Sequence, residues 1–422
     1  MISLKGKKLL ILAGATVHCK VVEAAKAMGV YTIVTDYLDN SPAKAIADES
    51  WMLNIMDVDA IAERCKRENV DGVLNFCIDP AQRPYVEICQ KLGLPCYGNS
   101  DQVYIMTDKR SFKKFCIEHG LDIIPSYTKE DVGADKCDYP LFVKPTDSRG
   151  SRGQAICYNK KEAMAAIKNA VCESSDGGVV IEKYMHGKQD FSMTYFVCAG
   201  VPYLIRTCDR YLGRIEDGLN KQCVGCIGPS KYSNLYIEKV HKKAIDFIKA
   251  LGVENGPVFM QGFVDGATIR FYDPGLRFPG GEYERLLQEI TGVDLMSPLV
   301  EFALTGTMSL PKGITESPYL LNGYHSIQLP ITARPGTISV LNGIDTICED
   351  SRVTVAFKRY EPGECVPSTG DVRQRVCEVA LVTKPDESVC EAVRFVQANL
   401  KVLDNYGNDM LVSLVDPFEL KY

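Results

Sequence analysis

The chain has 422 residues, 46% of them hydrophobic and 24% charged, a balance typical of globular proteins with a sizeable core. Because domains usually contain about 100–200 residues, this length predicts two to four of them. The formal net charge of -6 gives no electrostatic reason to expect nucleic acid or an anionic membrane as a partner.

Hydrophobic runs and cysteines indicate a cytoplasmic protein. No apolar run reaches the ~20 residues that a membrane-spanning helix needs, and the start of the chain fits a strand better than a signal peptide. The 17 cysteines are scattered among apolar positions, as expected of reduced, buried thiols. Cys223 and Cys226 have the spacing of a metal or redox pair, but no second pair is suitably placed to complete a zinc site. We therefore interpret them as structural or incidental thiols.

Strands and helices alternate over residues 1–106. The hydrophobic pattern predicts strands at 8–13, 31–36, 50–53 and 72–76, and helices at 21–28, 59–68 and 82–92. Short strands separated by helices of this length predict a doubly wound parallel sheet. Its ligand crevice is expected beyond the carboxyl ends of the strands, at residues 14–18, 36 and 79–83. The turn at Gly14 lacks the glycine fingerprint of a dinucleotide site.

The rest of the chain mixes strands and helices less regularly. The pattern predicts helices at 109–120, 161–171, 237–251 and 282–291, and strands at 140–145, 156–158, 179–184, 191–198 and 203–206. A hairpin is predicted at 257–264 and 268–272. The polar, glycine-rich stretch 209–230 is interpreted as a long functional loop. From about residue 324, short strands and turns predict a small final module.

The strongest local signal is the segment 142–154, FVKPTDSRGSRGQ. A predicted strand carries Lys144 near its end, and a loop of small residues follows, in which backbone N–H groups can surround phosphate oxygens. The order of lysine first and loop second, with no helix opening at the loop, differs from a P-loop. An exposed hairpin with incidental basic residues is the alternative. The candidate phosphate-contacting residues of the loop are Ser148, Gly150, Ser151 and Gly153.

Two further segments carry residue types that suit a nucleotide and a metal. Residues 180–185 predict a strand running into a linker, and Asp190 beyond it suits ribose hydroxyls. In the predicted hairpin, Gln261 and Asp273 lie side by side and offer oxygen ligands that suit Mg²⁺. Arg277 follows closely enough to stabilise charge on a transferring phosphoryl group. Taken singly, each segment is equally compatible with an ordinary surface strand or hairpin.

The order and spacing of these segments, after an α/β domain and Asp108-Lys109, resemble the ATP-grasp superfamily over about residues 5–310. The nearest likeness is to its carboxylate–amine ligases and carbamoyl-phosphate-synthase-like group, among relatives that include L-amino-acid ligases, D-alanine–D-alanine ligase and biotin carboxylase. The resemblance implies an N-terminal doubly wound parallel-sheet domain at 1–106 and a two-lobed ATP-grasp domain at 107–323, with a flap lobe at about 125–198. The small C-terminal α+β module at 324–422 is similar to the final piece of L-amino-acid ligases.

The resemblance also implies roles for individual residues. Lys109 and Lys144 look like the two phosphate-contacting lysines, and Arg277 looks like the arginine beside the transferred phosphoryl group. Arg277 and Lys144 are thus the catalytic candidates. Gln261 and Asp273 look like the residues that hold Mg²⁺ or Mn²⁺. The hinge acid, the adenine-contacting segment and the ribose-binding acid correspond to Glu182, Lys183, Tyr184, Met185 and Asp190, with Gln189 competing for the last role.

Two positions depart from the family pattern. Gln261 stands where an acid is usual, and Gly275 stands where an asparagine is usual. The metal site therefore loses a negative charge and one side-chain ligand. These departures keep open a non-catalytic, ATP-binding module as an alternative to an enzyme.

The resemblance implies an ADP-forming ligase that uses ATP to phosphorylate a small-molecule carboxylate and couples the acyl phosphate to an amine, forming a carbon–nitrogen bond. An ATP-dependent carboxylase using bicarbonate is the other alternative. Closing segments must keep water from the acyl phosphate, and we expect residues 147–153 and 209–230 to be these lids. A homodimer is the arrangement expected from symmetry alone. The substrate-binding candidates are Arg83, Arg206, Arg210, Arg214 and Glu282.

Overall fold

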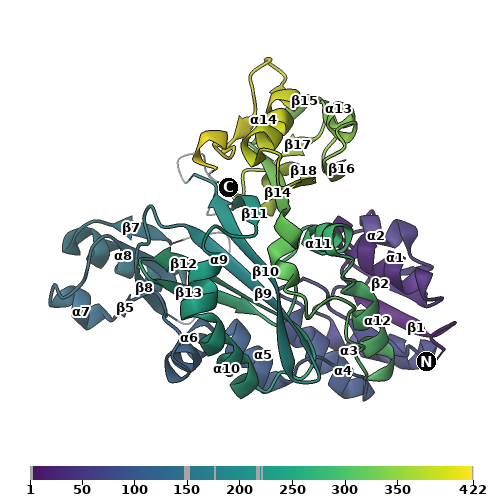
Figure 1. The fold of residues 1–422 in the computed structure, drawn as a ribbon. Helices are drawn as coiled ribbons and strands as arrows, with labels where there is room; N and C mark the ends of the chain where they lie inside the picture. The colour runs from purple at the N-terminus through teal and green to yellow at the C-terminus, as the bar shows by residue number, and fades with distance from the viewer. Residues whose placement is uncertain (1–2, 147–152, 175–176, 215–218, 220–221, 421) are drawn as a thin grey trace.

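The computed structural model describes residues 3–146, 153–174, 177–214, 219, 222–420 and 422. Figure 1 shows an N-terminal α/β part and a smaller lobe on opposite sides of a long antiparallel sheet, with the last hundred or so residues stacked above that sheet. None of the helices in these ranges combines the length and apolar character needed to cross a membrane.

A four-stranded parallel sheet with the order β3-β2-β1-β4 forms the N-terminal part. Residues 9–12 of its central strand are fully buried, because helices cover both faces of a doubly wound sheet. The predicted parallel, doubly wound sheet is confirmed. Its elements are β1 (Lys8–Leu12), α1 (Cys19–Ala27), β2 (Tyr31–Thr35), α2 (Pro42–Ile46), β3 (Glu49–Trp51), α3 (Val58–Glu68), β4 (Gly72–Leu74) and α4 (Gln82–Leu92).

The smaller lobe is a four-stranded antiparallel sheet with the order β5-β8-β6-β7, with a core of its own beneath helix α8. Two helices, α5 (Ser100–Thr107) and α6 (Lys109–Glu118), precede it along the chain. Asp108 caps α6, since its carboxylate accepts a hydrogen bond from the N–H of Ser111. The lobe contains β5 (Ser126–Tyr127), α7 (Lys129–Gly133), β6 (Leu141–Pro145), β7 (Ala155–Cys157), α8 (Lys160–Glu173) and β8 (Val179–Lys183).

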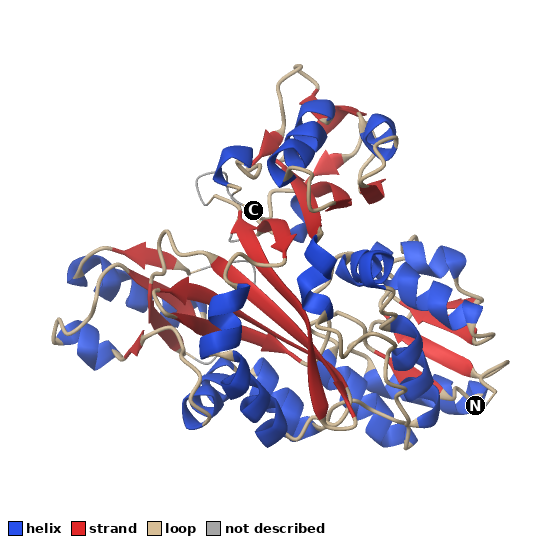
Figure 2. Cartoon of the chain, in the orientation of Figure 1, coloured by secondary structure: helices blue, strands red, loops and turns tan. Residues whose placement is uncertain are grey.

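A nine-stranded antiparallel sheet joins the middle and the end of the chain (Figure 2). Its order is β13-β12-β9-β10-β11-β14-β18-β16, and β20 pairs with β14. Strands β11 and β14 make the connection, so the last part of the chain extends the sheet of the middle part. The strands are β9 (Asp190–Cys198), β10 (Val201–Leu212), β11 (Cys223–Gly228), β12 (Gly256–Asp265), β13 (Thr268–Gly275), β14 (His325–Ala333), β16 (Val353–Lys358), β18 (Arg375–Thr383) and β20 (Leu411–Val412).

Helices cover this sheet, and a second core lies at its C-terminal end. The main hydrophobic core runs from Leu4 to Leu321, whereas a separate core contains residues from Leu219 to Leu420. The boundaries expected between three domains stay a prediction. The remaining elements are α9 (Ser233–Lys239), α10 (His241–Leu251), α11 (Tyr283–Thr291), α12 (Met296–Thr305), β15 (Gly336–Asn342), α13 (Ile344–Cys348), β17 (Cys365–Val366), α14 (Val389–Asn399), β19 (Lys401–Asp404) and the 3-10 helices Thr16–His18, Pro318–Gly323, Val372–Gln374 and Pro417–Glu419.

The structure corrects two sequence predictions. The stretch 209–230 is not one long loop, because β10 and β11 pair across it. Its charged residues suggested solvent, but Asp209 is buried and accepts hydrogen bonds from Ser230 and Tyr422. The single helix predicted at 237–251 is two helices that meet at Val240. Part of one predicted lid, residues 147–152, lies outside the described residues.

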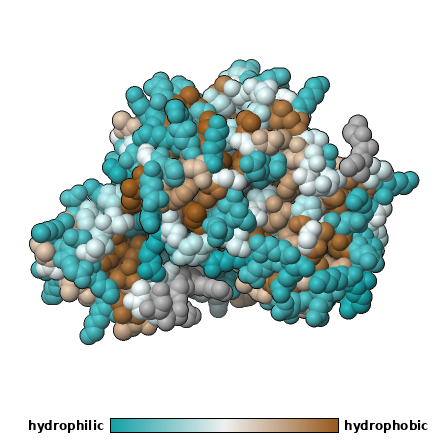
Figure 3. Space-filling model, turned by 90° about the horizontal axis from the view of Figure 1, so that it is seen from below, coloured by the Kyte–Doolittle hydropathy of each residue, from teal (hydrophilic) through white to brown (hydrophobic). Residues whose placement is uncertain are grey.

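The underside of the molecule has a mixed surface. Figure 3 shows hydrophilic side chains over most of this face, with hydrophobic ones scattered between them. Such scattering is ordinary for a folded chain.

Candidate functional site

Polar side chains gather on one face of the nine-stranded sheet. In the strand register, Asp190 of β9 pairs with Arg210 of β10, and Ser192 pairs with Gln261 of β12. Gln261 in turn pairs with Asp273 of β13, as the predicted hairpin requires. Because alternate residues of a strand face the same side, a row of polar groups crosses four strands.

A carboxylate between two lysines lies at the edge of the smaller lobe. The side chain of Glu182, on β8, is 5% exposed and accepts hydrogen bonds from the ammonium groups of Lys144, at 2.7 Å, and of Lys113. Burial alone would raise its pKa, but the two ammonium groups lower the pKa of Glu182 to about 2. Glu182 is therefore ionised and holds Lys144 in place, while other donors of that ammonium group stay available for a ligand.

Lys109 is the first residue of helix α6. Charged side chains of the smaller lobe and of the nine-stranded sheet both act on it. Desolvation and the positive charge of Lys144 lower the pKa of Lys109, against the opposing charges of Asp273 and Glu182. Among the described residues, its ammonium group makes no hydrogen bond or ion pair. The structure thus brings two lysines near a carboxylate of the large sheet, and phosphate oxygens are suitable ligands for such a group.

The hinge segment after Glu182 presents an apolar surface. Met185 is buried in a small cluster with Ile124 and Phe263, against which Tyr272 packs. An apolar platform of this kind suits the face of an aromatic base. The side chain of Lys183 lies 3.7 Å from Asp138, and the N–H groups of Lys183 and Tyr184 donate to Pro125 and Pro140.

Asp190 is held by partners on the neighbouring strands. One oxygen of its carboxylate lies 2.6 Å from Nη1 of Arg210 and 3.0 Å from the hydroxyl of Tyr272. The other oxygen is buried without a partner in the described part of the chain. Burial raises the pKa of Asp190 to about 6, against the charge of Arg210. An unpartnered carboxylate oxygen fits a ligand that donates a hydrogen bond, such as a ribose hydroxyl.

Asp273 and Gln261 form a small oxygen-donor pair. Asp273 is partly buried, and burial together with the charge of Asp79 raises its pKa, against Lys109, Arg277 and Arg210. Its carboxylate makes no hydrogen bond or ion pair with a described residue. The Oε1 of Gln261 accepts a hydrogen bond from Tyr272, at 3.3 Å.

This pair fits a divalent ion that is also bound by phosphate. No group of three or more histidine, cysteine, aspartate or glutamate side chains in the described ranges is arranged to hold a metal ion. Mg²⁺ needs no such group, since it commonly takes one or two protein oxygens together with phosphate oxygens and water. The donor set of Asp273 and Gln261 is therefore sufficient for that ion and too small for a metal cage.

Local packing explains why position 275 carries a glycine. A Cβ at this position would lie 2.4 Å from a ring carbon of Phe259, the residue paired with Gly275 across the hairpin. The ring of Phe259 thus fills the space where a side chain would stand. It also packs against the guanidinium group of Arg277, at 4.6 Å.

Arg277 is held beside the N-terminal part of the chain. It is buried, its Nε lies 3.2 Å from a carboxylate oxygen of Asp79, and its Nη1 donates to the carbonyl of Phe278. Asp79 follows the last parallel strand, in the crevice expected from the sequence. The lysines, Asp273 and Arg277 therefore belong to one group of charges in which Asp79 also takes part.

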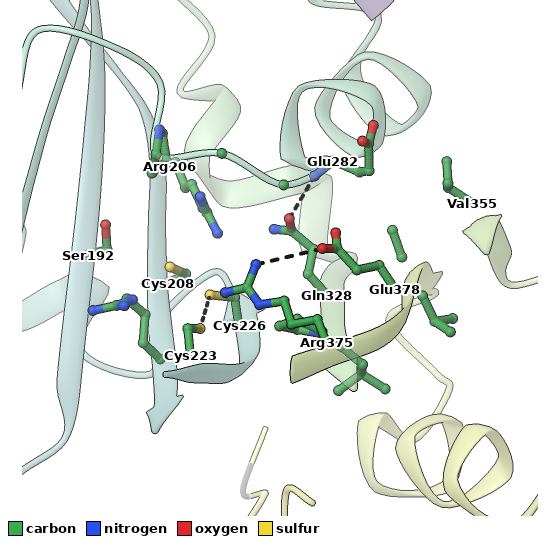
Figure 4. A pocket seen from close by; sticks show the side chains of 18 of the residues that line it. Ser192, Arg206, Cys208, Cys223, Cys226, Glu282, Gln328, Val355, Arg375 and Glu378 are labelled. Carbon is green, nitrogen blue, oxygen red and sulfur yellow. Dashed lines mark hydrogen bonds and ion pairs between the residues drawn. The ribbon is translucent and has the colours of Figure 1, made fainter. Parts of the chain in front are cut away.

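A pocket opens next to Gln261 and extends towards the C-terminal part of the chain. Its volume is about 160 Å³. Figure 4 shows side chains from β9, β10, β11, β14 and β18 around it, together with Glu282, whose N–H donates to Gln328 at 2.9 Å. Three arginines line it: Arg206, Arg210 and Arg375. This wall favours an anionic ligand.

Cysteines form part of the same wall. The sulfur atoms of Cys223 and Cys226 lie 3.3 Å apart, and both residues line the pocket with Cys208. The bulge between β10 and β11 brings the two side chains together. They are packed as small polarisable groups, and their interpretation as structural thiols stays a prediction.

Some expected site residues lie elsewhere. Arg83 contacts Thr107 and the ring of Tyr104, and it lines a different surface pocket. Arg214 is exposed just beyond β10, where its N–H donates to Ser413. Gly153 has a left-handed φ of 68° and packs against Pro145. Ser148, Gly150 and Ser151 are outside the described residues. The roles expected for all of them stay predictions.

Sequence reasoning missed several residues of the site. Lys113 lies one helical turn after Lys109, so the helical period was a usable signal. Tyr272 directly precedes Asp273 on the predicted strand. For Arg375 and Glu378 there was no local signal, because they reach the pocket from a strand more than a hundred residues away.

Comparisons with known proteins agree with this geometry. Residues 108–258 match the family model described as the carbamoyl-phosphate synthase L chain, ATP binding domain. The chain is 27% identical over 192 residues to formate-dependent phosphoribosylglycinamide formyltransferase of Sulfurisphaera tokodaii, covering 42% of this chain and 47% of that one. It is 22% identical over 352 residues to the propionyl-CoA carboxylase alpha chain of Caenorhabditis briggsae, covering 76% and 45%. The chain thus spans about half the length of these curated relatives.

Solved structures resemble nearly the whole chain. An L-amino acid ligase from Bacillus licheniformis superimposes with a TM-score of 0.76 at 17% identity, covering 95% of this chain and 99% of the other. A biotin carboxylase from Campylobacter jejuni gives a TM-score of 0.75 at 19% identity, covering 94% and 92%. These likenesses show that the chain has the fold of these ATP-grasp enzymes, and the family match adds a resemblance in sequence over residues 108–258. The resemblance expected from its sequence is confirmed.

Proposed function

We propose that the protein is an ADP-forming ligase that activates a small-molecule carboxylate with ATP and couples it to an amine. The observation that carries the proposal is the adjacency of two binding features. The charges of Lys144 and Asp273 both act on Lys109, Asp273 pairs with Gln261 across the hairpin, and Gln261 also lines the arginine pocket. A phosphoryl donor and an anionic acceptor would therefore meet at Gln261.

The residues support each part of the reaction. In it, a substrate carboxylate attacks the γ-phosphoryl group, ADP leaves, and an amine then displaces phosphate from the acyl phosphate. Lys109 and Lys144 would orient the phosphates, and Arg277 would stabilise the charge that develops during transfer. Mg²⁺ at Asp273 and Gln261 would neutralise phosphate charge when bound. Arg206, which is buried and lines the pocket, would hold the carboxylate.

A phosphate-release assay tests the proposal. The full chain is mixed with ATP and Mg²⁺, and release is measured with single carboxylates, with amino-acid pairs, and with bicarbonate. Release that needs both a carboxylate and an amine supports the ligase. Release with bicarbonate alone would identify a carboxylase instead. Tight ATP binding without release in any mixture would leave a non-catalytic module, for which the loss of an acid at Gln261 would account.

A further inference from the structure

Arg206 is a buried cation that forms no ion pair with any residue the structure describes. It is 3% exposed, and its Nε has no hydrogen-bond partner in the described part of the chain. The guanidinium group stacks 4.6 Å from the centre of the Tyr283 ring. A ring face compensates a buried charge only in part, so the site favours an anion at this position.

Arg375 is a second cation in the pocket wall, and its positive charge is only partly balanced by a neighbouring carboxylate. Its Nη1 lies 3.6 Å from Oε1 of Glu378, and its Nε is buried without a partner among the described residues. The same oxygen of Glu378 also accepts a hydrogen bond from Arg359. One carboxylate therefore serves two guanidinium groups, which leaves one positive charge in excess.

The other charges of the pocket wall are already paired. Arg210 binds Asp190, and Glu282 lies between Lys20 and Arg285. Neither Asp190 nor Glu282 is therefore left to compensate the two unmatched cations. Figure 4 shows the guanidinium groups of Arg206 and Arg375 turned into the same pocket. The hydroxyl of Ser192, also buried without a described partner, lines it too.

The two cations stand at different places along the sheet. Arg206 is on β10, and Arg375 is on β18, three strands further on in the sheet order. Neighbouring strands are about 4.8 Å apart, so the two backbones are separated by roughly 14 Å before sheet curvature. Two side chains from such positions approach a ligand from opposite ends. A single carboxylate would satisfy one of them and leave the other uncompensated.

We propose that the acid substrate is a dicarboxylate, with one carboxylate bound at Arg206 beside Gln261 and the second bound by Arg375. This inference rests on the proposed ligase function and adds the class of its acid substrate. Arg375 is then a specificity-determining residue: it binds the carboxylate that does not react. Monocarboxylates of equal chain length would lack one charge-assisted hydrogen bond.

Calorimetry on the full chain, with Mg²⁺ and a non-hydrolysable ATP analogue, tests this without turnover. The probes are succinate and glutarate, each matched with the monocarboxylate of equal length, butyrate or pentanoate. A phosphate monoester, glycerol phosphate, is a further probe. We expect a dicarboxylate to bind about 10- to 100-fold more tightly than its matched monocarboxylate, as the loss of one hydrogen bond to a charged group predicts. Arg375→Gln should abolish that difference and leave the affinity for the nucleotide analogue unchanged.

Arg373→Gln is the matched control. Arg373 lies two residues away, is largely exposed, and pairs with Asp371 outside the pocket. Its replacement should preserve the preference for dicarboxylates. Equal binding of both members of every pair, or a preference that survives Arg375→Gln, would overturn the inference. Dependence on Arg375 for the phosphate monoester alone would also overturn it. Selective dicarboxylate binding without phosphate release would refute the ligase function and leave only the dicarboxylate-binding site at Arg206 and Arg375.

Discussion

Lys144 donates to Glu182 across two neighbouring strands of the smaller lobe, with 2.7 Å between the ammonium nitrogen and the carboxylate oxygen. Lys113 donates to the other oxygen of the same carboxylate from helix α6. This group therefore fastens the smaller lobe to the helix that begins with Lys109. Both the stability of the lobe and the position of Lys144, which we propose binds phosphate, therefore depend on one ionised acid.

The first prediction concerns the pH dependence of stability. The pKa of Glu182 is about 2 in the folded protein, against an ordinary value near 4.5 for a glutamate in an unfolded chain. Ionised Glu182 therefore contributes about 3 kcal/mol to the free energy of unfolding. This contribution is present above pH 4.5 and is lost as the pH falls towards 2. We expect Glu182→Gln to lower the free energy of unfolding at pH 7 and to flatten its decline between pH 5 and 2. Urea unfolding across this range measures both. An unchanged pH profile in the variant would contradict the assignment.

The second prediction concerns the nucleotide. Lys109→Ala should weaken ATP binding by about 10- to 100-fold, because a charge-assisted hydrogen bond to phosphate is lost. Calorimetry measures the affinity. Lys114→Ala on the same helix is the control, since Lys114 is exposed and pairs with Glu118 on the surface. If both variants bind ATP as the wild type does, Lys109 does not contact the phosphates.

The fold could be predicted from the sequence because short local patterns determine most of its elements. Apolar runs such as residues 9–12 fix the parallel strands, and the turn at Asp265 and Gly266 fixes the hairpin that pairs Gln261 with Asp273. The same local reasoning failed at 209–230. There, the carboxylate of Asp209 accepts a hydrogen bond from the distant Tyr422, and a one-dimensional pattern cannot show that contact.

The residues that we propose face the nucleotide could be chosen from the sequence by residue type, whereas the residues that line the pocket could be chosen only in part. Lys109, Lys144 and Asp273 lie on elements whose order along the chain resembles a known family. Arg206 was also expected. Its counterpart Arg375 was not, because its position depends on the long-range pairing of β14 with β11 on one side and with β18 on the other. Such pairings are set by the packing of the whole sheet.

The third prediction concerns the carboxylate of Asp273 as a ligand of the metal ion. Asp273→Asn keeps the shape of the side chain and removes its charge, so we expect the fold to persist and the rate of phosphate release to fall by about 100-fold or more. Thermal unfolding checks the fold, and the release assay checks the rate. A variant with full activity would require the metal to be bound at another residue.

The fourth prediction concerns the departure at Gly275. Gly275→Asn restores the residue usual in the family, yet its Cβ would lie 2.4 Å from the ring of Phe259. We expect a loss of about 1–3 kcal/mol in stability from overpacking, and no gain in activity. The control is Gly266→Asn in the open turn, where a Cβ meets no atom within 4 Å and asparagine tolerates the positive φ. Gain of activity in Gly275→Asn would show that the ring moves aside.

The fifth prediction concerns a buried lysine that holds the rim of the pocket. Lys20, on helix α1, lies 2.7 Å from Glu284 and 3.5 Å from Glu282, and it donates to the carbonyl of Gly281. Lys20→Met would leave two buried carboxylates without this charge. We expect a loss of about 3–5 kcal/mol in stability, measured by urea unfolding.

Lys20→Met should weaken binding of the acid substrate as well as lower stability, because Gly281 and Glu282 line the pocket. In Lys20→Met, measured at a temperature where the variant is folded, we expect KM for the acid to rise more than kcat falls. Lys26→Met on the same helix is the control, since Lys26 is partly exposed and lies near Asp48 on the surface. A loss of stability with an unchanged KM would restrict Lys20 to a purely structural role, whereas a rise in KM would show that the N-terminal helix positions the wall that the acid contacts.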